Sequence, residues 1–258
     1  MRAVDAGDLV VERTGQVAWV TFNRPDARNA MTFDMYDDLH DLCDRLDGDA
    51  EVRVVVVRGA GDKSFAAGTD IRQFLAFETR EDALGYEARI GRVLRRLSAL
   101  KKPTLALVQG DAVGGGLFLS LACDLRFAAE HARFGAPVAR TLGNCTAPFS
   151  FTLLASTVGM VRAREILLRA RLVGAAEARQ IGLVDEVHPA AELEAKVREQ
   201  AETLTGHAPL TMAAVKEATR HVRDHFALDD AEDIILSCYL SQDFKEGARA
   251  FLAKRRPN

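Results

Sequence analysis

The stretch "GDAVGGGLFLSLACDLRFAA", residues 110–129, places three consecutive glycines between two strongly apolar segments. Upstream, "TLALV" (104–108) is short, apolar and partly β-branched, which is typical of a buried strand. Downstream, residues 117–123 are apolar almost throughout, as in a helix inside a core. A strand, a glycine turn and a helix start together leave backbone N–H groups unpaired at a helix N-terminus. One glycine would suffice for a turn, so three glycines indicate that a ligand or the helix approaches the strand closely.

Three uses fit such a segment: cradling phosphate, holding an oxyanion, or packing the helix closely on its strand. The segment contains no GxGxxG and no terminal GKS or GKT, so it matches neither nucleotide fingerprint. A second segment, "KSFAAGTDIRQF" (63–74), also follows an apolar strand and places Gly68 and Thr69 at its exit. Two such exits can each offer one N–H group to a single oxygen, which is what an oxyanion hole requires. The pair therefore favours an oxyanion hole, with close helix packing as the structural alternative.

The first half of the chain alternates predicted strands and helices. "QVAWVTFN" (16–23) alternates enough for a half-buried strand, and "RVVVVRG" (53–59) is a continuous β-branched run suited to a strand covered on both faces. Between them, apolar residues recur at helical spacing after Thr32, a typical N-cap residue. A second amphipathic helix is predicted from about residue 81 to residue 100, and Pro103 marks its end.

Composition and organisation predict one α/β domain with a helical extension. Beyond about residue 145 strand signals fade and no low-complexity linker intervenes, so we expect a core at 1–195 and a helical C-terminal region at 196–258. Hydrophobic residues make up 48% and charged residues 28%, and the net charge of −3 argues against a nucleic-acid partner. Four widely spaced cysteines fit reduced thiols, and the N-terminus is too polar for a signal peptide. No apolar run approaches the roughly 18 residues needed to cross a bilayer, so we expect a cytoplasmic protein without membrane contact.

Together with "TFNRPDARNAM" (21–31), the two glycine segments resemble the crotonase family of enoyl-CoA hydratases and isomerases. The resemblance continues through "ACDLRFAAEHARFGAP", "GAAEARQIGLVDEV" and the tail "DFKEGARAFLAKRRP", so it spans nearly the whole chain. It implies an α/β fold built as a spiral of ββα units, with a helical C-terminal trimerisation region. It also implies an acyl-CoA thioester as partner, a homotrimer or a dimer of trimers, and neither a metal nor a cofactor besides the coenzyme A of the substrate.

The resemblance assigns roles to individual positions. The two oxyanion N–H groups would come from Thr69 and from Gly115, the middle glycine. Losing one such donor typically costs about 3–4 kcal/mol of transition-state stabilisation. The coenzyme A path would be formed by Ala66, Ala67, Asp70 and Ile71, with Arg28 near the phosphates and Phe251 and Lys254 closing over the nucleotide, often from a neighbouring subunit. The acyl pocket would hold Phe118, Val138, Asn144 and Cys145. The structural alternatives are surface charge for Arg28 and Lys254 and capping for Asp70.

Two positions depart from the family pattern. The hydratases carry one glutamate three residues after the middle glycine, where this chain has Phe118, and another after the proline of "FGAP", where it has Val138. Hydration needs a base that activates water and an acid that protonates the α-carbon, and apolar side chains supply neither. The aspartate of the family's dehalogenase is also missing, since Ala147 stands there. We therefore expect a subgroup that keeps the oxyanion hole and lacks both catalytic glutamates.

Several functions stay open at this point. An enzyme of this kind could decarboxylate or hydrolyse its thioester, or hydrate it with a base recruited from elsewhere in the chain. Alternatively, the chain could be a non-catalytic acyl-CoA binding or carrier protein. Cys145 is a candidate nucleophile, but a lone cysteine without a placed histidine is more often inert. His221 and His225 have helical spacing, but no HExxH motif or third ligand accompanies them, which disfavours a metal site.

Overall fold

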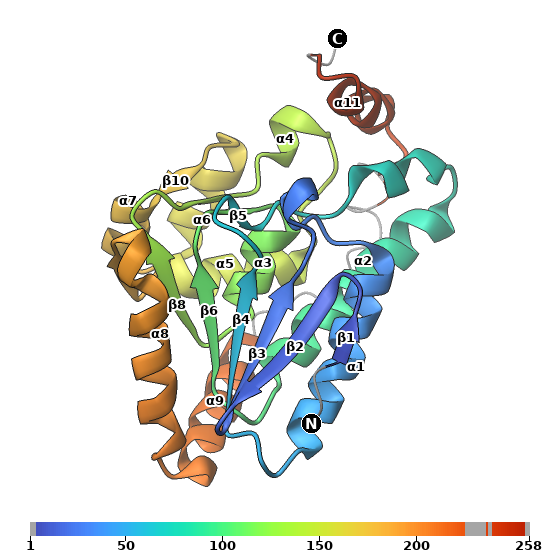
Figure 1. The fold of residues 1–258 in the computed structure, drawn as a ribbon. Coiled ribbons are helices and arrows are strands. Elements are labelled where there is room, and N and C mark those ends of the chain that lie inside the picture. The colour runs from blue at the N-terminus through green and yellow to red at the C-terminus, as the bar shows by residue number, and fades with distance from the viewer. Residues whose placement is uncertain (1–3, 225–235, 237–238, 256–258) are drawn as a thin grey trace.

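Two β-sheets carry the fold in the computed structural model, which describes residues 4–224, 236 and 239–255 (Figure 1). The larger sheet has seven strands in the order β1-β2-β3-β4-β6-β8-β11. From β3 onward neighbouring strands pair in parallel, whereas β1 and β2 pair antiparallel at one edge. The strands are β1 (Val4–Ala6), β2 (Leu9–Thr14), β3 (Val17–Phe22), β4 (Val54–Gly59), β6 (Thr104–Val108), β8 (Leu125–Ala129) and β11 (Glu186–His188).

The valine run of β4 is explained by burial on both faces of the larger sheet. Because side chains alternate across a strand, every second valine faces the main core, which also contains α1 (Phe33–Gly48) and α2 (Arg80–Ser98). The other valines face the opposite side and pack with α8 (Ala190–Thr205). In Figure 1, α8 lies along the left flank of the sheet, and α1 and α2 lie on the other side. Both strands and both helices predicted in the first half are therefore present. The prediction that β3 is half-buried is wrong, because β3 is buried along its whole length and its two faces belong to two different core clusters.

Local sequence signals set the starts of α1 and α2. Thr32 Oγ1 accepts the Met35 N–H group at 3.2 Å and so caps α1, as predicted. Thr79 and Asp82 form a reciprocal capping box at the start of α2. At its other end α2 stops at Ser98, ahead of Pro103, so the two helices lie where the sequence predicts them.

A smaller sheet has the strand order β10-β9-β7-β5, and the two glycine segments follow its strands β5 and β7. Its strands are β5 (Ser64–Ala66), β7 (Asp111–Val113), β9 (Arg133–Gly135) and β10 (Val173–Gly174). The prediction that strands fade after residue 145 is wrong, because β10 and β11 lie beyond it and each joins one of the sheets. β10 has two residues and β11 has three. Such strands are too short for a period-2 pattern, and their pairing with β9 and β8 defines them instead.

The remaining helical segments surround the sheets. They are η1 (Pro25–Ala27), η2 (Ile71–Ala76), α3 (Gly115–Leu121), α4 (Val138–Thr141), α5 (Pro148–Val158), α6 (Met160–Leu168), α7 (Ala175–Gln180), α9 (Pro209–Asp224) and α11 (Gln242–Leu252). α11 packs against η2 and α4 of its own chain. α8 runs across the predicted boundary between 195 and 196 and packs on the larger sheet, and the division into two regions stays a prediction. In the described ranges, none of the helices combines the length and the apolar character that crossing a membrane requires.

Candidate functional site

The ends of β5 and β7 bring the two glycine segments into contact. Gly68 has a φ of 97° and Gly114 a φ of 56°, both in the region that favours glycine. A Cβ at Gly68 would lie 3.5 Å from the Gly115 nitrogen, and a Cβ at Gly115 would lie 3.7 Å from Thr69 Oγ1. The main chains at Thr69 and Gly115 are therefore neighbours. We call residues 68–70 and 114–116 the oxyanion region.

Hydrogen bonding in the oxyanion region orients the N–H groups of Thr69 and Gly115. The Met31 N–H group donates to the Gly68 carbonyl and the Asp70 N–H group donates to the Met31 carbonyl, both at 2.8 Å. Because successive N–H groups of an extended segment point to opposite sides, the Thr69 N–H group points away from Met31. Gly115 is the first residue of α3, so its N–H group has no acceptor within the helix. Two donors of this kind suit one incoming oxygen.

Two buried phenols hold Thr69 in place. The Tyr36 hydroxyl lies 3.0 Å from Thr69 Oγ1 and the Tyr86 hydroxyl lies 2.8 Å from it. Burial raises the pKa of both phenols, so they are neutral hydrogen-bonding groups at physiological pH. Sequence reasoning missed both tyrosines, because aromatic residues at helical spacing are typical of an ordinary core.

The three consecutive glycines have three different roles. Gly114 turns the chain at positive φ. A Cβ at Gly115 would lie 2.5 Å from the Tyr36 hydroxyl oxygen, and a Cβ at Gly116 would overlap the Ala66 carbonyl oxygen. Only glycine at the third position therefore lets α3 rest on β5. Close helix packing, the structural alternative, explains this third glycine.

Two apolar side chains stand at the positions where the sequence analysis expects a departure from the family pattern. Phe118 is buried on α3 as part of the main core, and Val138 is partly buried as the first residue of α4. Neither side chain can transfer a proton. Asn144 and Cys145 follow α4 in the chain and are also partly buried.

Glu87, Tyr239 and Asn144 form a hydrogen-bonded chain that we call the polar network. Asn144 Nδ2 donates to the Tyr239 hydroxyl at 3.2 Å, and that hydroxyl donates to Glu87 Oε1 at 2.6 Å. Burial raises the pKa of Glu87 to about 7, although the Tyr239 hydrogen bond lowers it in part. Asn144 Oδ1 is buried and has no hydrogen-bond partner within the described ranges. Sequence reasoning missed Glu87 and Tyr239, which belong to no motif.

Aromatic rings from α2, η2 and α11 enclose the polar network. The ring centroids of Phe74 and Tyr86 lie 4.9 Å apart, and those of Tyr239 and Phe244 lie 4.8 Å apart. The Tyr86 and Tyr239 centroids lie 5.8 Å apart. The Tyr239 ring is therefore a direct neighbour of the ring of Tyr86, the tyrosine that holds Thr69.

Arg28 lines a groove of about 380 Å³ beside the smaller sheet. The other lining residues are Asp62, Lys63, Asp111, His131 and Arg133. The Ala67 N–H group donates to the Arg28 carbonyl at 3.1 Å, and Ala66 precedes it as the buried last residue of β5. The groove thus adjoins the predicted coenzyme A path. Within it Arg133 pairs with the Asp111 carboxylate at 2.6 Å, so Arg28 and Lys63 are the cations that suit phosphate groups.

Asp70 and Ile71 begin η2, on the other side of Thr69. The Asp70 carboxylate accepts the Arg72 N–H group at 3.3 Å, so the predicted capping role is confirmed. Hydrogen bonds from the side chains of Arg72 and Arg24 lower the pKa of the Asp70 carboxyl to about 2. α11 packs against η2 and carries Phe251, which is 50% exposed, and the exposed Lys254 follows it.

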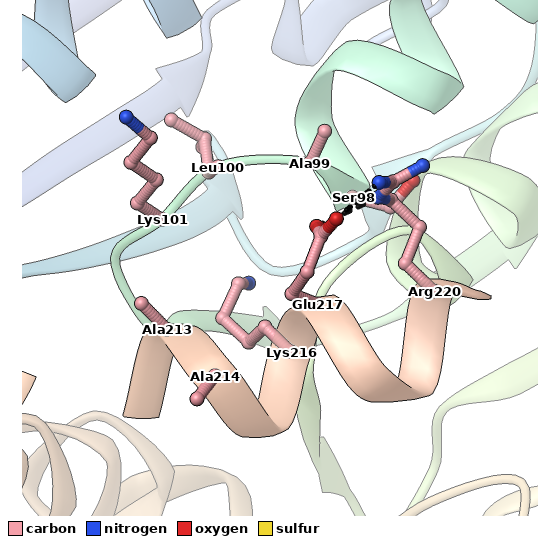
Figure 2. A pocket seen from close by; sticks show the side chains of 9 residues that line it. All are labelled: Ser98, Ala99, Leu100, Lys101, Ala213, Ala214, Lys216, Glu217 and Arg220. Atoms are coloured by element: carbon pink, nitrogen blue, oxygen red, sulfur yellow. Dashed lines mark hydrogen bonds and ion pairs between the residues drawn. The ribbon is translucent and has the colours of Figure 1, made fainter. Parts of the chain in front are cut away.

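A second pocket, of about 280 Å³, lies between the end of α2 and α9, away from the residues described above (Figure 2). In this pocket the Glu217 carboxylate forms an ion pair with Arg220. The same carboxylate contacts His221 Nε2 at 2.6 Å, and His225 lies outside the described residues. Across the described part of the chain, no group of three or more His, Cys, Asp or Glu side chains is placed to hold a metal ion.

Comparisons with known proteins agree with this arrangement. Residues 12–258 match the family model described as Enoyl-CoA hydratase/isomerase. The chain is 35% identical to the short-chain-enoyl-CoA hydratase of Clostridium acetobutylicum, with 98% of this chain and 97% of that one covered. It is 36% identical to the crotonyl-CoA hydratase of Syntrophomonas wolfei, with 97% of each chain covered. A crystal structure of an enoyl-CoA hydratase from Mycobacterium avium subsp. paratuberculosis is similar with a TM-score of 0.85, at 33% identity over 98% of each chain.

The two sheets, their helical layers and these likenesses define an α/β protein with the crotonase fold. The chain belongs to the enoyl-CoA hydratase/isomerase family. The structure brings Thr69 and Gly115 together and makes Asn144 a member of the polar network, with Cys145 next to it in the chain. The roles of these residues, and of the predicted coenzyme A residues, stay predictions.

Proposed function

We propose that this protein is an acyl-CoA enzyme in which the N–H groups of Thr69 and Gly115 stabilise the enolate oxygen of a bound thioester. The observation that carries the proposal is the contact between the ends of β5 and β7, which sets the two main chains side by side. Two converging N–H donors favour an oxygen on which negative charge develops. The names of the relatives, which are hydratases of enoyl-CoA and crotonyl-CoA, support a CoA thioester as substrate.

In this proposal the chemistry differs from ordinary hydration. Phe118 and Val138 replace the two glutamates, so the chain belongs to a subgroup that lacks both. Decarboxylation and thioester hydrolysis depend mainly on the oxyanion hole, and hydration requires a base from elsewhere in the chain. The buried Phe118 favours an apolar and fairly dry acyl pocket.

Coenzyme A is held, in this proposal, along the segment from Ala66 to Ile71. The groove around Arg28 takes the phosphates, since it joins this segment through the Ala67 N–H group. Phe251 and Lys254 close over the nucleotide, and their exposure leaves them available for that contact. Coenzyme A arrives as part of the substrate, and the proposed chemistry uses neither a separate cofactor nor a metal.

The proposed assembly is a homotrimer or a dimer of trimers. α9 has no buried residue and exposes three large apolar side chains, those of Leu210, Val215 and Val222. In this proposal another subunit covers these exposed apolar groups. The proposed location is cytoplasmic, because a reducing compartment suits the buried thiols of Cys43 and Cys123. Light scattering at micromolar concentration checks the assembly, and a monomer would contradict it.

The second candidate is a non-catalytic acyl-CoA binding or carrier protein. The apolar side chains of Phe118 and Val138 favour it, because they remove two proton-transfer groups without disturbing the coenzyme A path. Turnover on a panel of acyl-, enoyl- and malonyl-type CoA thioesters separates the two candidates. Product formation supports the enzyme, whereas tight binding of every ligand without turnover supports the carrier.

The oxyanion hole is tested with acetoacetyl-CoA, whose enolate has its own ultraviolet absorbance. Gly115→Pro removes one N–H donor at the first position of α3, where proline is otherwise tolerated. Because the new Cβ would meet the Tyr36 hydroxyl, Tyr36→Phe alone is the matched control for the Tyr36→Phe/Gly115→Pro pair. We expect the pair to weaken enolate formation about 10²-fold. Equal enolate formation would exclude Gly115 as a donor, and a folded protein that binds no acyl-CoA would refute the whole proposal.

A further inference from the structure

The polar network is the place where the predicted acyl pocket contains a carboxylate. Asn144, predicted to line that pocket, donates to Tyr239, and Tyr239 donates to Glu87 at 2.6 Å. The rings of Tyr86 and Phe244 pack against the Tyr239 ring, and Tyr239 is almost fully buried. A hydrogen-bonded carboxylate inside an otherwise aromatic wall is costly to bury, so a functional use is the natural explanation.

We propose that Glu87, acting through the Tyr239 hydroxyl, accepts and returns the α-proton of the bound thioester in place of the two missing glutamates. This inference rests on the proposed function, because it needs the enolate that the oxyanion hole stabilises. It adds the proton-transfer group for which sequence reasoning found no residue.

Placement on α2 connects the proposed base to the oxyanion region. Tyr86 and Glu87 are consecutive residues, and the Tyr86 hydroxyl lies 2.8 Å from Thr69 Oγ1. The Tyr86 and Tyr239 rings lie 5.8 Å apart between their centroids. One helix therefore supports both the oxyanion donor, through Tyr86, and the carboxylate that would take the proton.

The electrostatic setting of Glu87 supports the same role. Burial raises the pKa of Glu87 to about 7, close to the pH at which a general base works best. Elsewhere in the described ranges, hydrogen bonds from arginines lower the pKa values of Asp70, Glu165 and Glu217.

The step balances without any further reactant. The α C–H bond of the thioester breaks, and its electron pair moves into the enolate, whose oxygen the N–H groups of Thr69 and Gly115 bind. The proton passes to the Tyr239 oxygen while the Tyr239 hydroxyl proton passes to the Glu87 carboxylate. The reverse step returns a proton to carbon. Asn144 Nδ2 keeps the Tyr239 oxygen oriented, and Asn144 Oδ1, which lacks a partner among the described residues, can accept a hydrogen bond from a bound water or substrate hydroxyl.

The test follows the exchange of the α-protons of butyryl-CoA for deuterium in D₂O by nuclear magnetic resonance. This readout depends on enolate formation alone and not on the later steps of the natural reaction. Glu87→Gln keeps the size of the side chain and removes the base, and we expect exchange at least about 10²-fold slower. Glu81→Gln is the matched control, because Glu81 lies exposed on the same helix, and it should exchange like the native protein. Calorimetry should show unchanged butyryl-CoA binding in both variants.

The pH profile separates proton transfer from a structural role. The titratable groups around Glu87 in the described ranges are Tyr36, Tyr86 and Tyr239, with Cys145 near Tyr86. Burial raises the pKa of all three tyrosines, so their hydroxyls stay neutral. We expect native exchange to rise through one step near pH 7 that persists in Glu81→Gln and disappears in Glu87→Gln.

Tyr239→Phe keeps the ring and interrupts the relay, so it should also exchange at least about 10²-fold slower. Native-like exchange in Glu87→Gln or in Tyr239→Phe would overturn the inference, as would a native protein that binds butyryl-CoA and exchanges nothing. A folded native protein that binds no acyl-CoA would instead refute the proposed function.

Discussion

The Tyr86 side chain lies between the oxyanion region and the polar network and contacts both. The two regions are nevertheless built in different ways. The oxyanion region uses main-chain N–H groups, placed by glycines that let β5, β7 and α3 touch. The polar network uses side chains from three distant segments, and Tyr239 reaches Glu87 across 152 positions of the chain. The first arrangement constrains the backbone tightly, whereas the second can change by single substitutions. The proposed oxyanion hole should therefore tolerate fewer substitutions than the proposed proton-transfer groups.

The largest expected effect concerns crotonyl-CoA hydration by the native protein. General acid–base groups each contribute about 10²–10⁴-fold, and the two positions predicted to hold them are apolar in this sequence. We expect hydration well below roughly 10 s⁻¹, a rate typical of ordinary enzymes. Spectrophotometric loss of the enoyl absorbance measures it, and an ordinary rate would show that Phe118 and Val138 do not remove this chemistry.

Introducing glutamates at positions 118 and 138 tests the same claim about hydration. Phe118→Glu/Val138→Glu should gain measurable hydratase activity if the oxyanion hole is intact. The new carboxylates enter apolar surroundings, so their pKa values should rise and some stability should be lost. Single variants provide the control, because each supplies only one of the two groups.

Gly116→Ala tests whether the oxyanion region depends on close backbone contact. The added methyl group would overlap the Ala66 carbonyl oxygen, and a backbone atom cannot move aside as a flexible side chain can. We expect the free energy of unfolding to fall by about 3 kcal/mol or more, measured by urea denaturation. An unchanged midpoint would mean that α3 does not rest on β5 as described.

Glu87→Gln tests the polar network through stability and its pH dependence. The pKa of Glu87 is about 7 in the folded protein and near its ordinary value of 4.5 when unfolded, so the folded state holds the extra proton between these values. The free-energy cost of burying the ionised Glu87 carboxylate therefore grows as the pH rises from about 4.5 to about 7, and above pH 7 it is fully present. We expect Glu87→Gln to be more stable than the native protein by on the order of 2 kcal/mol at pH 8, with little difference at pH 4.5. A pH-independent difference would contradict the raised pKa.

The smallest effect comes from a glycine outside both regions. Gly85 lies in α2, and a Cβ there would meet no atom within 4 Å. Gly85→Ala should therefore stabilise the protein by up to about 1 kcal/mol, because alanine favours the helix. Urea denaturation measures it beside Gly116→Ala, and destabilisation would mean that α2 packs differently near Glu87.

Sequence reasoning reached the oxyanion region because local patterns encode it. Strand, glycine and helix signals follow one another in the chain and indicate the two segments, whereas the choice of Thr69 and Gly115 within them comes from the resemblance to the crotonase family. Glu87 and Tyr239 could not be found in this way, since neither belongs to a motif and the two residues lie 152 positions apart in the chain. β10 and β11 were missed for a related reason, because strands of two or three residues carry no period of their own.

The vibrational frequency of a bound thioester carbonyl reports whether the oxyanion hole works. Butyryl-CoA labelled with ¹³C at the carbonyl can be followed by difference infrared spectroscopy on native protein, on Tyr36→Phe and on the Tyr36→Phe/Gly115→Pro pair. Two N–H donors pull electron density toward the oxygen, so the carbonyl stretch should move to lower frequency on binding to the native protein and to Tyr36→Phe. The shift should shrink clearly in the pair, which has lost the Gly115 donor. A carbonyl stretch that stays at its solution value in the native complex would contradict the assignment of Thr69 and Gly115 as the oxyanion hole.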